Sequence, residues 1–162
     1  MSWKHLSVIA LLTLSSSASA LDGDIRLSSL QNQSASLNEV VDNGKFTLVM
    51  IWATDCVPCE AQKPMIQQFH DAYHESTATV VGIANDGMGM ANEIQVLIDR
   101  HEPTYPNYVA APETFFSDYE LTTGKKFRAT PTYIMFNPDN ELMGVAVGPI
   151  SREKLDQIVS DR

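Results

Sequence analysis

Two cysteines, Cys56 and Cys59, are the only thiols in this 162-residue chain, and they are spaced as C-x-x-C. Thiols this close can form and break a disulfide with little movement of the backbone. The thiolate is the attacking species in such exchange. A helix is expected to begin at the motif, and its positive N-terminal end favours a thiolate at Cys56. Cys59 lies one turn further in and is more shielded. Cys56 is therefore the predicted nucleophile, and Cys59 the predicted resolving cysteine.

A purely structural disulfide is the first alternative for this pair. Exported domains that depend on disulfides for stability carry several widely spaced pairs, whereas this chain carries one. Closing so short a loop removes little entropy from the unfolded chain, so the bond would stabilise the fold weakly. A chain of this length buries about 70% of its unfolded surface and needs no such support. A redox-active pair is therefore the predicted use.

The motif stands between a predicted strand and a predicted helix. Phe46–Trp52 is apolar apart from Thr47, which is typical of a strand buried on both faces. Residues 58–73 follow with a helical pattern, with Pro58 in the first turn, where its missing N–H costs nothing. Reaction sites of open α/β sheets lie at the C-terminal ends of strands. The pattern therefore places the cysteines at such an edge.

The rest of the chain predicts further strands and helices around this unit. Residues 21–33 form a loose lead-in with one short edge strand. The remaining strands are Ala78–Ala84, Asn107–Ala110, Thr132–Phe136 and Leu142–Val147, and the remaining helices span residues 36–41, 91–100, 114–121 and 151–159. This order predicts an α/β fold with one central mixed sheet, parallel in its first half, antiparallel in its second and flanked by helices.

The first 20 residues have the pattern of a secretory signal. Lys4 supplies a positive charge, residues 6–14 are mostly apolar, and Ala18 and Ala20 mark a cleavage site. The apolar run is too short for a helix across a bilayer of about 30 Å, so stable membrane insertion is not expected. The prediction is a cleaved signal peptide, residues 1–20, and one domain, residues 21–162. The net charge of −9 makes nucleic acid an unsuitable partner.

Together these features resemble the thioredoxin fold, and in particular the exported TlpA/ResA-like thiol–disulfide oxidoreductases. The resemblance covers the chain from Ile25 onwards. It rests on motifs that the family shares: Trp52-Ala53-Thr54 before Cys56-Val57-Pro58-Cys59, Pro64 inside the helix, Tyr105-Pro106, Thr130-Pro131-Thr132, and Gly144 to Gly148 before the last helix. A C-x-x-C alone is less specific, because it also forms half of many metal sites.

The resemblance implies an exported or periplasmic enzyme, a protein-disulfide oxidoreductase that acts as a reductase and needs no cofactor or metal. A membrane thiol-transfer protein would supply its electrons, and its partners would be client proteins with disulfides or thiols, such as apocytochromes or a cuproprotein site. An oxidising direction stays open.

The resemblance also assigns supporting site residues. Pro131 would be cis and lie against the disulfide, which leaves the backbone at Thr130 free to pair with an extended client. Trp52 is expected beneath the motif, while Val57 and Pro58 form the turn between the thiols and Pro58 stiffens it.

The chain departs from the family at two places. Asp55 stands before the first cysteine, where Trp is usual, and its carboxylate disfavours the thiolate. Relatives place an acid near the thiols to move protons, but Met50 and Gln62 occupy those positions here. Glu60 is expected to point to solvent. Proton transfer to Cys59 would then use water or Glu60.

Three rival functions use the same residues. Met88 and Met90, with the thiols, suggest copper handling, although packing in the loop and at the start of the next helix is the favoured explanation of these methionines. His70 and His74 complete a pattern that superficially resembles a zinc site, but a helix would hold His70 about 16 Å from Cys59, so both histidines are expected on an exposed face. A redox-inert binding module is opposed by the intact cysteines.

Overall fold

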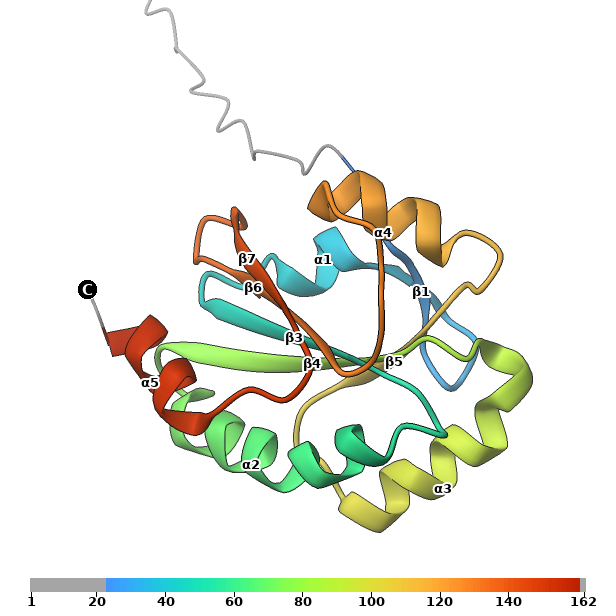
Figure 1. The fold of residues 1–162 in the computed structure, drawn as a ribbon, viewed down its shortest axis with the longest axis horizontal. Helices are drawn as coiled ribbons and strands as arrows, with labels where there is room; N and C mark the ends of the chain where they lie inside the picture. Colours follow the sequence, from blue (N-terminus) through green and yellow to red (C-terminus); the bar gives the residue numbers. More distant parts are fainter. Residues whose placement is uncertain (1–22, 161–162) are drawn as a thin grey trace, which may run out of the picture.

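The computed structural model describes residues 23–160, so the predicted signal peptide, residues 1–20, lies outside the described part of the chain. These residues form both helices and strands (Figure 1). In chain order they are β1 (Arg26–Ser28), β2 (Ser34–Ser36), α1 (Leu37–Val41), β3 (Phe46–Trp52), α2 (Val57–Tyr73), β4 (Ala78–Ala84), the 3-10 turn η1 (Met88–Met90), α3 (Ala91–His101), β5 (Asn107–Ala110), α4 (Phe115–Thr123), β6 (Thr132–Phe136), β7 (Leu142–Val147) and α5 (Arg152–Ser160).

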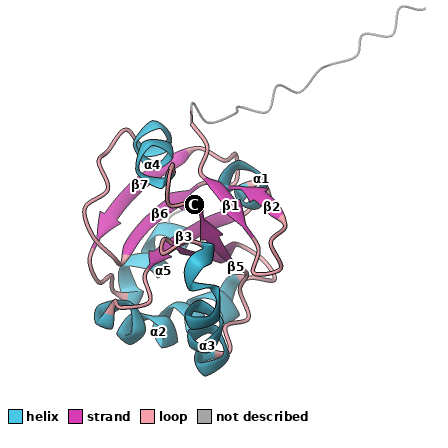
Figure 2. Ribbon diagram, turned by 90° about the vertical axis from the view of Figure 1, so that its right-hand side faces the viewer, coloured by secondary structure: helices cyan, strands magenta, loops and turns pink. Residues whose placement is uncertain are grey.

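The strands form one mixed sheet in the order β2-β1-β5-β4-β3-β6-β7. Strands β3, β4 and β5 are parallel, whereas β6, β7, β1 and β2 pair antiparallel with their neighbours. Helices α2, α3 and α5 cover one face, and α1 and α4 cover the other, as the two perpendicular views show (Figures 1 and 2). The predicted mixed α/β architecture is confirmed.

Strand β3 lies at the centre of both hydrophobic cores. All seven of its residues are buried. Leu48, Met50 and Trp52 pack on the face of α2, α3 and α5, whereas Val49 and Ile51 pack on the face of α1 and α4. Because successive side chains of a strand point to opposite faces, burial on both faces explains why the run shows no polar alternation.

The lead-in contains more structure than the sequence indicated. Two strands form where one was predicted, because β1 and β2 make a hairpin and β1 also pairs with β5. Helix α1 follows with a capping box between Ser36 and Glu39. The Arg26 side chain donates two hydrogen bonds to Asp118 of α4, at 3.0 and 3.1 Å. The hairpin was not predicted from the sequence, because its strands are short and carry polar side chains.

The expectation that His70 lies with His74 on an exposed helix face is wrong. His70 is buried, and its Nδ1 accepts a hydrogen bond from the backbone N–H of Val80 at 3.2 Å. Burial lowers the pKa of His70, and an accepting Nδ1 requires the neutral ring. The imidazole therefore ties α2 to β4.

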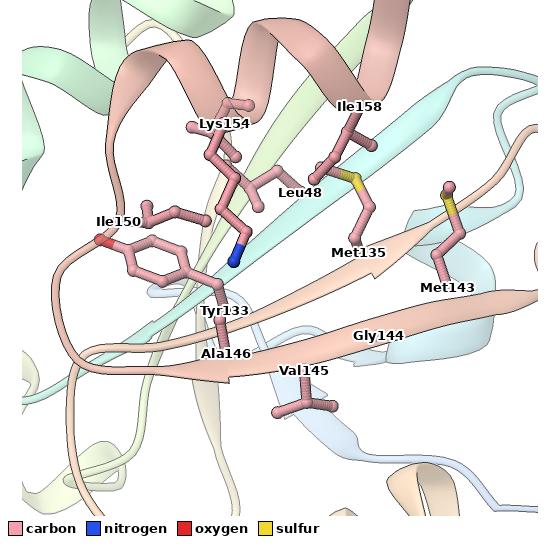
Figure 3. Close-up of a pocket in the computed structure, with 11 residues that line it drawn as sticks. Leu48, Tyr133, Met135, Met143, Gly144, Val145, Ala146, Ile150, Lys154 and Ile158 are labelled. Atoms are coloured by element: carbon pink, nitrogen blue, oxygen red, sulfur yellow. The ribbon is translucent and has the colours of Figure 1, made fainter. Parts of the chain in front are cut away.

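A small apolar cavity of about 210 Å³ lies between the sheet edge and α5. Its lining is drawn in Figure 3: Leu48, Tyr133, Met135, Met143, Gly144, Val145, Ala146, Ile150, Lys154, Leu155 and Ile158. Lys154 extends from α5 towards β7 in this view. Apart from the adjacent residues, a Cβ on Gly144 would meet no heavy atom of residues 23–160 within 4 Å, whereas a Cβ on Gly82 would meet Asn107 Oδ1 at 2.0 Å. The packing around Gly82 in β4 is therefore tight, whereas the space around Gly144 in β7 is open.

These two glycines make a matched stability test. Gly144→Ala is expected to stabilise the protein by roughly 0.5–1 kcal/mol, because a strand glycine is replaced where space is open. Gly82→Ala is expected to destabilise it by about 1–3 kcal/mol, because Asn107 must move. Urea unfolding of both variants measures these changes. A destabilised Gly144→Ala would contradict the packing described for β7.

Candidate active site

Cys56 and Cys59 are joined by a disulfide at the N-terminus of α2, directly beyond the C-terminal end of β3. Cys56 is the N-cap residue, and its Sγ accepts a hydrogen bond from the backbone N–H of Cys59 at 3.2 Å. This N–H and the helix dipole would stabilise negative charge on the Cys56 sulfur in the reduced pair. Cys56 is 6% exposed and Cys59 is 0% exposed. Of the two sulfurs, that of Cys56 is therefore the one that the helix N-terminus can activate as a thiolate and that a client can reach.

Trp52 lies beneath the motif, in the same apolar cluster as both cysteines. Its ring is buried, and the indole Nε1 has no hydrogen-bond partner in the part of the chain that the structure describes. The Nζ of Lys63 lies 3.9 Å from the ring centroid, which is within cation–π range. Strand β3 thus ends in the buried indole ring of Trp52, which packs beneath the disulfide.

The loop between Trp52 and Cys56 is held by Asp86, a residue that the sequence analysis did not single out. The Asp86 carboxylate accepts the Thr54 hydroxyl at 2.8 Å and the Thr54 backbone N–H at 3.1 Å. Asp86 follows β4, which pairs in parallel with β3. Neighbouring parallel strands end at the same edge of a sheet. The position of Asp86 just after a predicted strand was therefore the signal that could have identified it as a residue of the site.

The Thr130–Pro131 peptide bond is cis. Ile51 pairs with Thr132 across β3 and β6, so Pro131 lies beside the Trp52 end of β3. The Pro131 carbonyl accepts a hydrogen bond from the Gly148 N–H at 2.8 Å, and the Thr132 hydroxyl donates to the Ala129 carbonyl at 2.6 Å. This loop is therefore fixed from both sides at the edge that carries the disulfide.

Glu60 does not point to solvent as expected. It accepts hydrogen bonds from Lys63 Nζ at 2.5 Å and from His101 Nε2 at 2.7 Å. Burial alone would raise the pKa of Glu60, but the bonds from Lys63 and His101 outweigh it and hold the pKa below its usual value. Burial lowers the pKa of Lys63, whose side chain is only 7% exposed. Sequence reasoning missed Lys63 and His101, although Lys63 stands one turn after Cys59 on the same helix face.

Gln62, which stands where some relatives place an acid, serves as a structural tie. Its Oε1 accepts hydrogen bonds from the Tyr133 hydroxyl at 3.1 Å and from the Ile150 N–H at 2.9 Å. Burial raises the pKa of Tyr133, so the hydroxyl keeps its proton and donates. Gln62 thereby joins α2 to β6 and to the approach to α5.

The rim of the motif is open to solvent. Val57 is 79% exposed, and Asp55 and Pro58 are also exposed. A hollow of about 420 Å³ separates the motif loop from α3, and it is lined by Thr54, Asp55, Asn92, Glu93, Val96 and Leu97. Asp55 and Glu93 make this side of the motif acidic.

Met88 and Met90 are partly buried and pack against the apolar cluster that contains both cysteines. This agrees with the packing interpretation of these methionines. Among residues 23–160, no group of three or more His, Cys, Asp or Glu side chains is arranged to hold a metal ion. Nor does any helix in that range combine the length and apolarity needed to cross a membrane.

Comparison with known proteins gives consistent matches. The sequence model of the AhpC/TSA family matches residues 21–145. The thiol–disulfide oxidoreductase ResA of Oceanobacillus iheyensis is 25% identical over 118 residues, which cover 73% of this chain and 57% of that relative. The chain thus spans little more than half the length of this relative.

Solved structures show the same fold. A thioredoxin-family thiol:disulfide interchange protein from Chlorobium tepidum superposes with a TM-score of 0.71 at 23% identity, covering 87% of this chain and 94% of that one. A secreted disulfide oxidoreductase of Mycobacterium tuberculosis gives a TM-score of 0.66 at 18% identity, covering 85% and 95%. The expected thioredoxin fold is therefore confirmed.

The Glu60 cluster predicts a pH-dependent contribution to stability. The lowered pKa means that ionised Glu60 stabilises the fold above its unfolded pKa of 4.5, and that this stability is lost as the pH falls through the folded value. Glu60→Gln is expected to lower the free energy of unfolding at pH 6 by about 1.5 kcal/mol, since it removes hydrogen bonds to a charged group. The difference from the unsubstituted protein should shrink at pH 3. Urea unfolding at both pH values measures it, and an unchanged difference would contradict the assignment.

Proposed function

The chain belongs to the AhpC/TSA family, and on that premise we propose that it is a protein thiol–disulfide oxidoreductase that reduces disulfides of client proteins. The observation that carries this proposal is the disulfide at the N-terminus of α2, with the Cys56 sulfur at the N-cap and Cys59 buried behind it. A helix N-terminus stabilises the thiolate needed for exchange. The relatives' names supply the reaction class.

The reaction proceeds through a mixed disulfide. In the reduced protein, the Cys56 thiolate attacks one sulfur of the client disulfide, which forms a Cys56–client bond and releases the first client thiolate. Cys59 then loses its proton and attacks the Cys56 sulfur, which releases the second client thiolate. The client gains two electrons and takes up two protons. The protein is left with the Cys56–Cys59 disulfide seen in the structure.

Water is the proposed acceptor of the Cys59 proton. Glu60 is close in sequence, but its hydrogen bonds to Lys63 and His101 lower its pKa and make it a weak base. Met50 and Gln62 are neutral, so neither position supplies the acid found in relatives. Exchange therefore uses solvent at the open rim around Val57.

The reducing direction is supported by Asp55. Its exposed carboxylate directly precedes Cys56 and opposes the helix dipole, so it destabilises the Cys56 thiolate. A pair is strongly oxidising when its reduced form is stabilised, as in DsbA. A negative charge beside the nucleophile destabilises the reduced form instead, and so makes the dithiol a better reductant.

Clients would bind across the loop that contains the cis Thr130–Pro131 bond, with the backbone at Thr130 pairing with an extended client segment. The loop's position beside the Trp52 end of β3 supports this role. Each turnover leaves a disulfide, so a donor dithiol must regenerate the pair, and a membrane thiol-transfer protein is proposed as that donor. Export through the signal peptide at residues 1–20 fits the secreted relative from Mycobacterium tuberculosis.

Trapping tests the cysteine roles directly. Cys59→Ser retains the nucleophile but cannot resolve the intermediate, so it should accumulate a mixed disulfide with a disulfide-containing client such as insulin. Cys56→Ser loses the same internal disulfide but lacks the nucleophile, so it should trap at least tenfold less. Non-reducing electrophoresis after acid quench measures both. Equal trapping by the two variants, or none by either, would contradict the proposal.

A further inference from the structure

Lys125, Lys126 and Arg128 form a cationic cluster on a strongly acidic chain. The protein has a net charge of −9, and these three are among only eleven Lys and Arg residues. All three side chains are exposed. No ion pair joins any of them to another residue within 23–160. Three neighbouring cations without a partner leave a local positive potential on the surface.

The cluster lines a groove at the free edge of the sheet. The groove has a volume of about 510 Å³, and we call it the cationic groove; its lining is Tyr119, Lys125, Lys126, Arg128, Val145 and Val147. Within residues 23–160, strand β7 is the last strand of the sheet and pairs only with β6. Its outer backbone N–H and C=O groups are therefore available to another strand. Val147 is 50% exposed and presents an apolar surface beside them.

The cationic groove leads to the disulfide. Its cations lie on the connection from α4 to β6, which runs past the sheet and enters the loop of the cis Thr130–Pro131 bond (Figure 1). Val147 pairs with Thr132, and the Gly148 N–H is bonded to the Pro131 carbonyl. A client segment that crosses this loop can therefore continue along β7 into the groove.

The other side of the motif has the opposite charge. The hollow against α3 carries Asp55 and Glu93, and Asp86 lies in the loop beside it. An acidic segment that follows a client cysteine is repelled from this hollow and attracted to the cationic groove. Charge of opposite sign on the two sides fixes the direction in which such a segment lies.

We propose that the cationic groove binds an extended acidic segment of the client, which adds a strand to the edge of β7 while its carboxylates neutralise Lys125, Lys126 and Arg128. Strand addition supplies affinity through main-chain hydrogen bonds, and the cations supply selectivity and a faster encounter. The inference rests on the proposed disulfide exchange and adds the class of client. A flat anionic membrane would face much of the acidic surface of this chain, whereas a narrow acidic segment faces mainly the cations of the groove, so the segment fits better than a lipid surface.

The test uses three synthetic peptides with the same internal disulfide and an acidic, neutral or basic flanking segment. The reduced protein is mixed with each peptide, and the rate constants of reduction are measured from alkylated thiols by mass spectrometry. The acidic peptide should react about tenfold faster than the neutral one at low ionic strength, and the preference should fall as salt rises from about 0.01 to about 0.5 M. Lys126→Glu should abolish the preference.

Lys45→Glu is the matched control, since it changes the net charge equally at the N-terminal end of β3, the end opposite the disulfide. It should retain the preference. Equal rates for all three peptides, or an equal effect of Lys45→Glu, would overturn the docking site while leaving the exchange activity established. Failure to reduce any peptide would instead overturn the proposed function. Binding of the protein to phosphatidylglycerol vesicles that Lys126→Glu abolishes, without a peptide preference, would assign the groove to lipid and also overturn the proposal.

Discussion

The burial of β3 on both faces is the constraint on which the rest of the structure depends. A strand whose seven residues are all buried must lie in the interior of the sheet, between two layers of helices. Its last residue, Trp52, is consequently fixed at the edge where β4 also ends and β6 begins. The cysteine motif, the anchor at Asp86 and the cis-proline loop meet at this edge because each follows or precedes one of these three strands.

Much of this arrangement could be predicted from the sequence. The unbroken apolar run of β3, the cysteines directly after it and the helical pattern beyond them determine a local unit, and the alternation of elements gives the mixed sheet. The hairpin of β1 and β2 could not be predicted as well. Its strands have three residues each and carry exposed polar side chains, so tertiary pairing with β5 rather than local pattern creates them.

The polar groups around the site were the least predictable part. A lysine is usually exposed, and nothing local indicates that Lys63 lies over Trp52. Its ion pair with Glu60 does have a local signal, because the two residues are three apart on α2. His101 comes from another helix, so its contact with Glu60 depends on how α3 packs. His70 has the spacing of an exposed histidine, yet its ring is buried because it accepts a hydrogen bond from a backbone N–H of β4. Apart from the Lys63–Glu60 pair, each of these contacts joins residues of two different elements.

The Cys56–Cys59 pair is the proposed reductant, and the exposed Asp55 carboxylate beside it destabilises the Cys56 thiolate. Equilibration with glutathione redox buffers gives the reduction potential of the pair. We expect a value of about −250 mV, between thioredoxin and the glutaredoxins. A value of about −120 mV, as in the strong oxidant DsbA, would contradict the reducing direction.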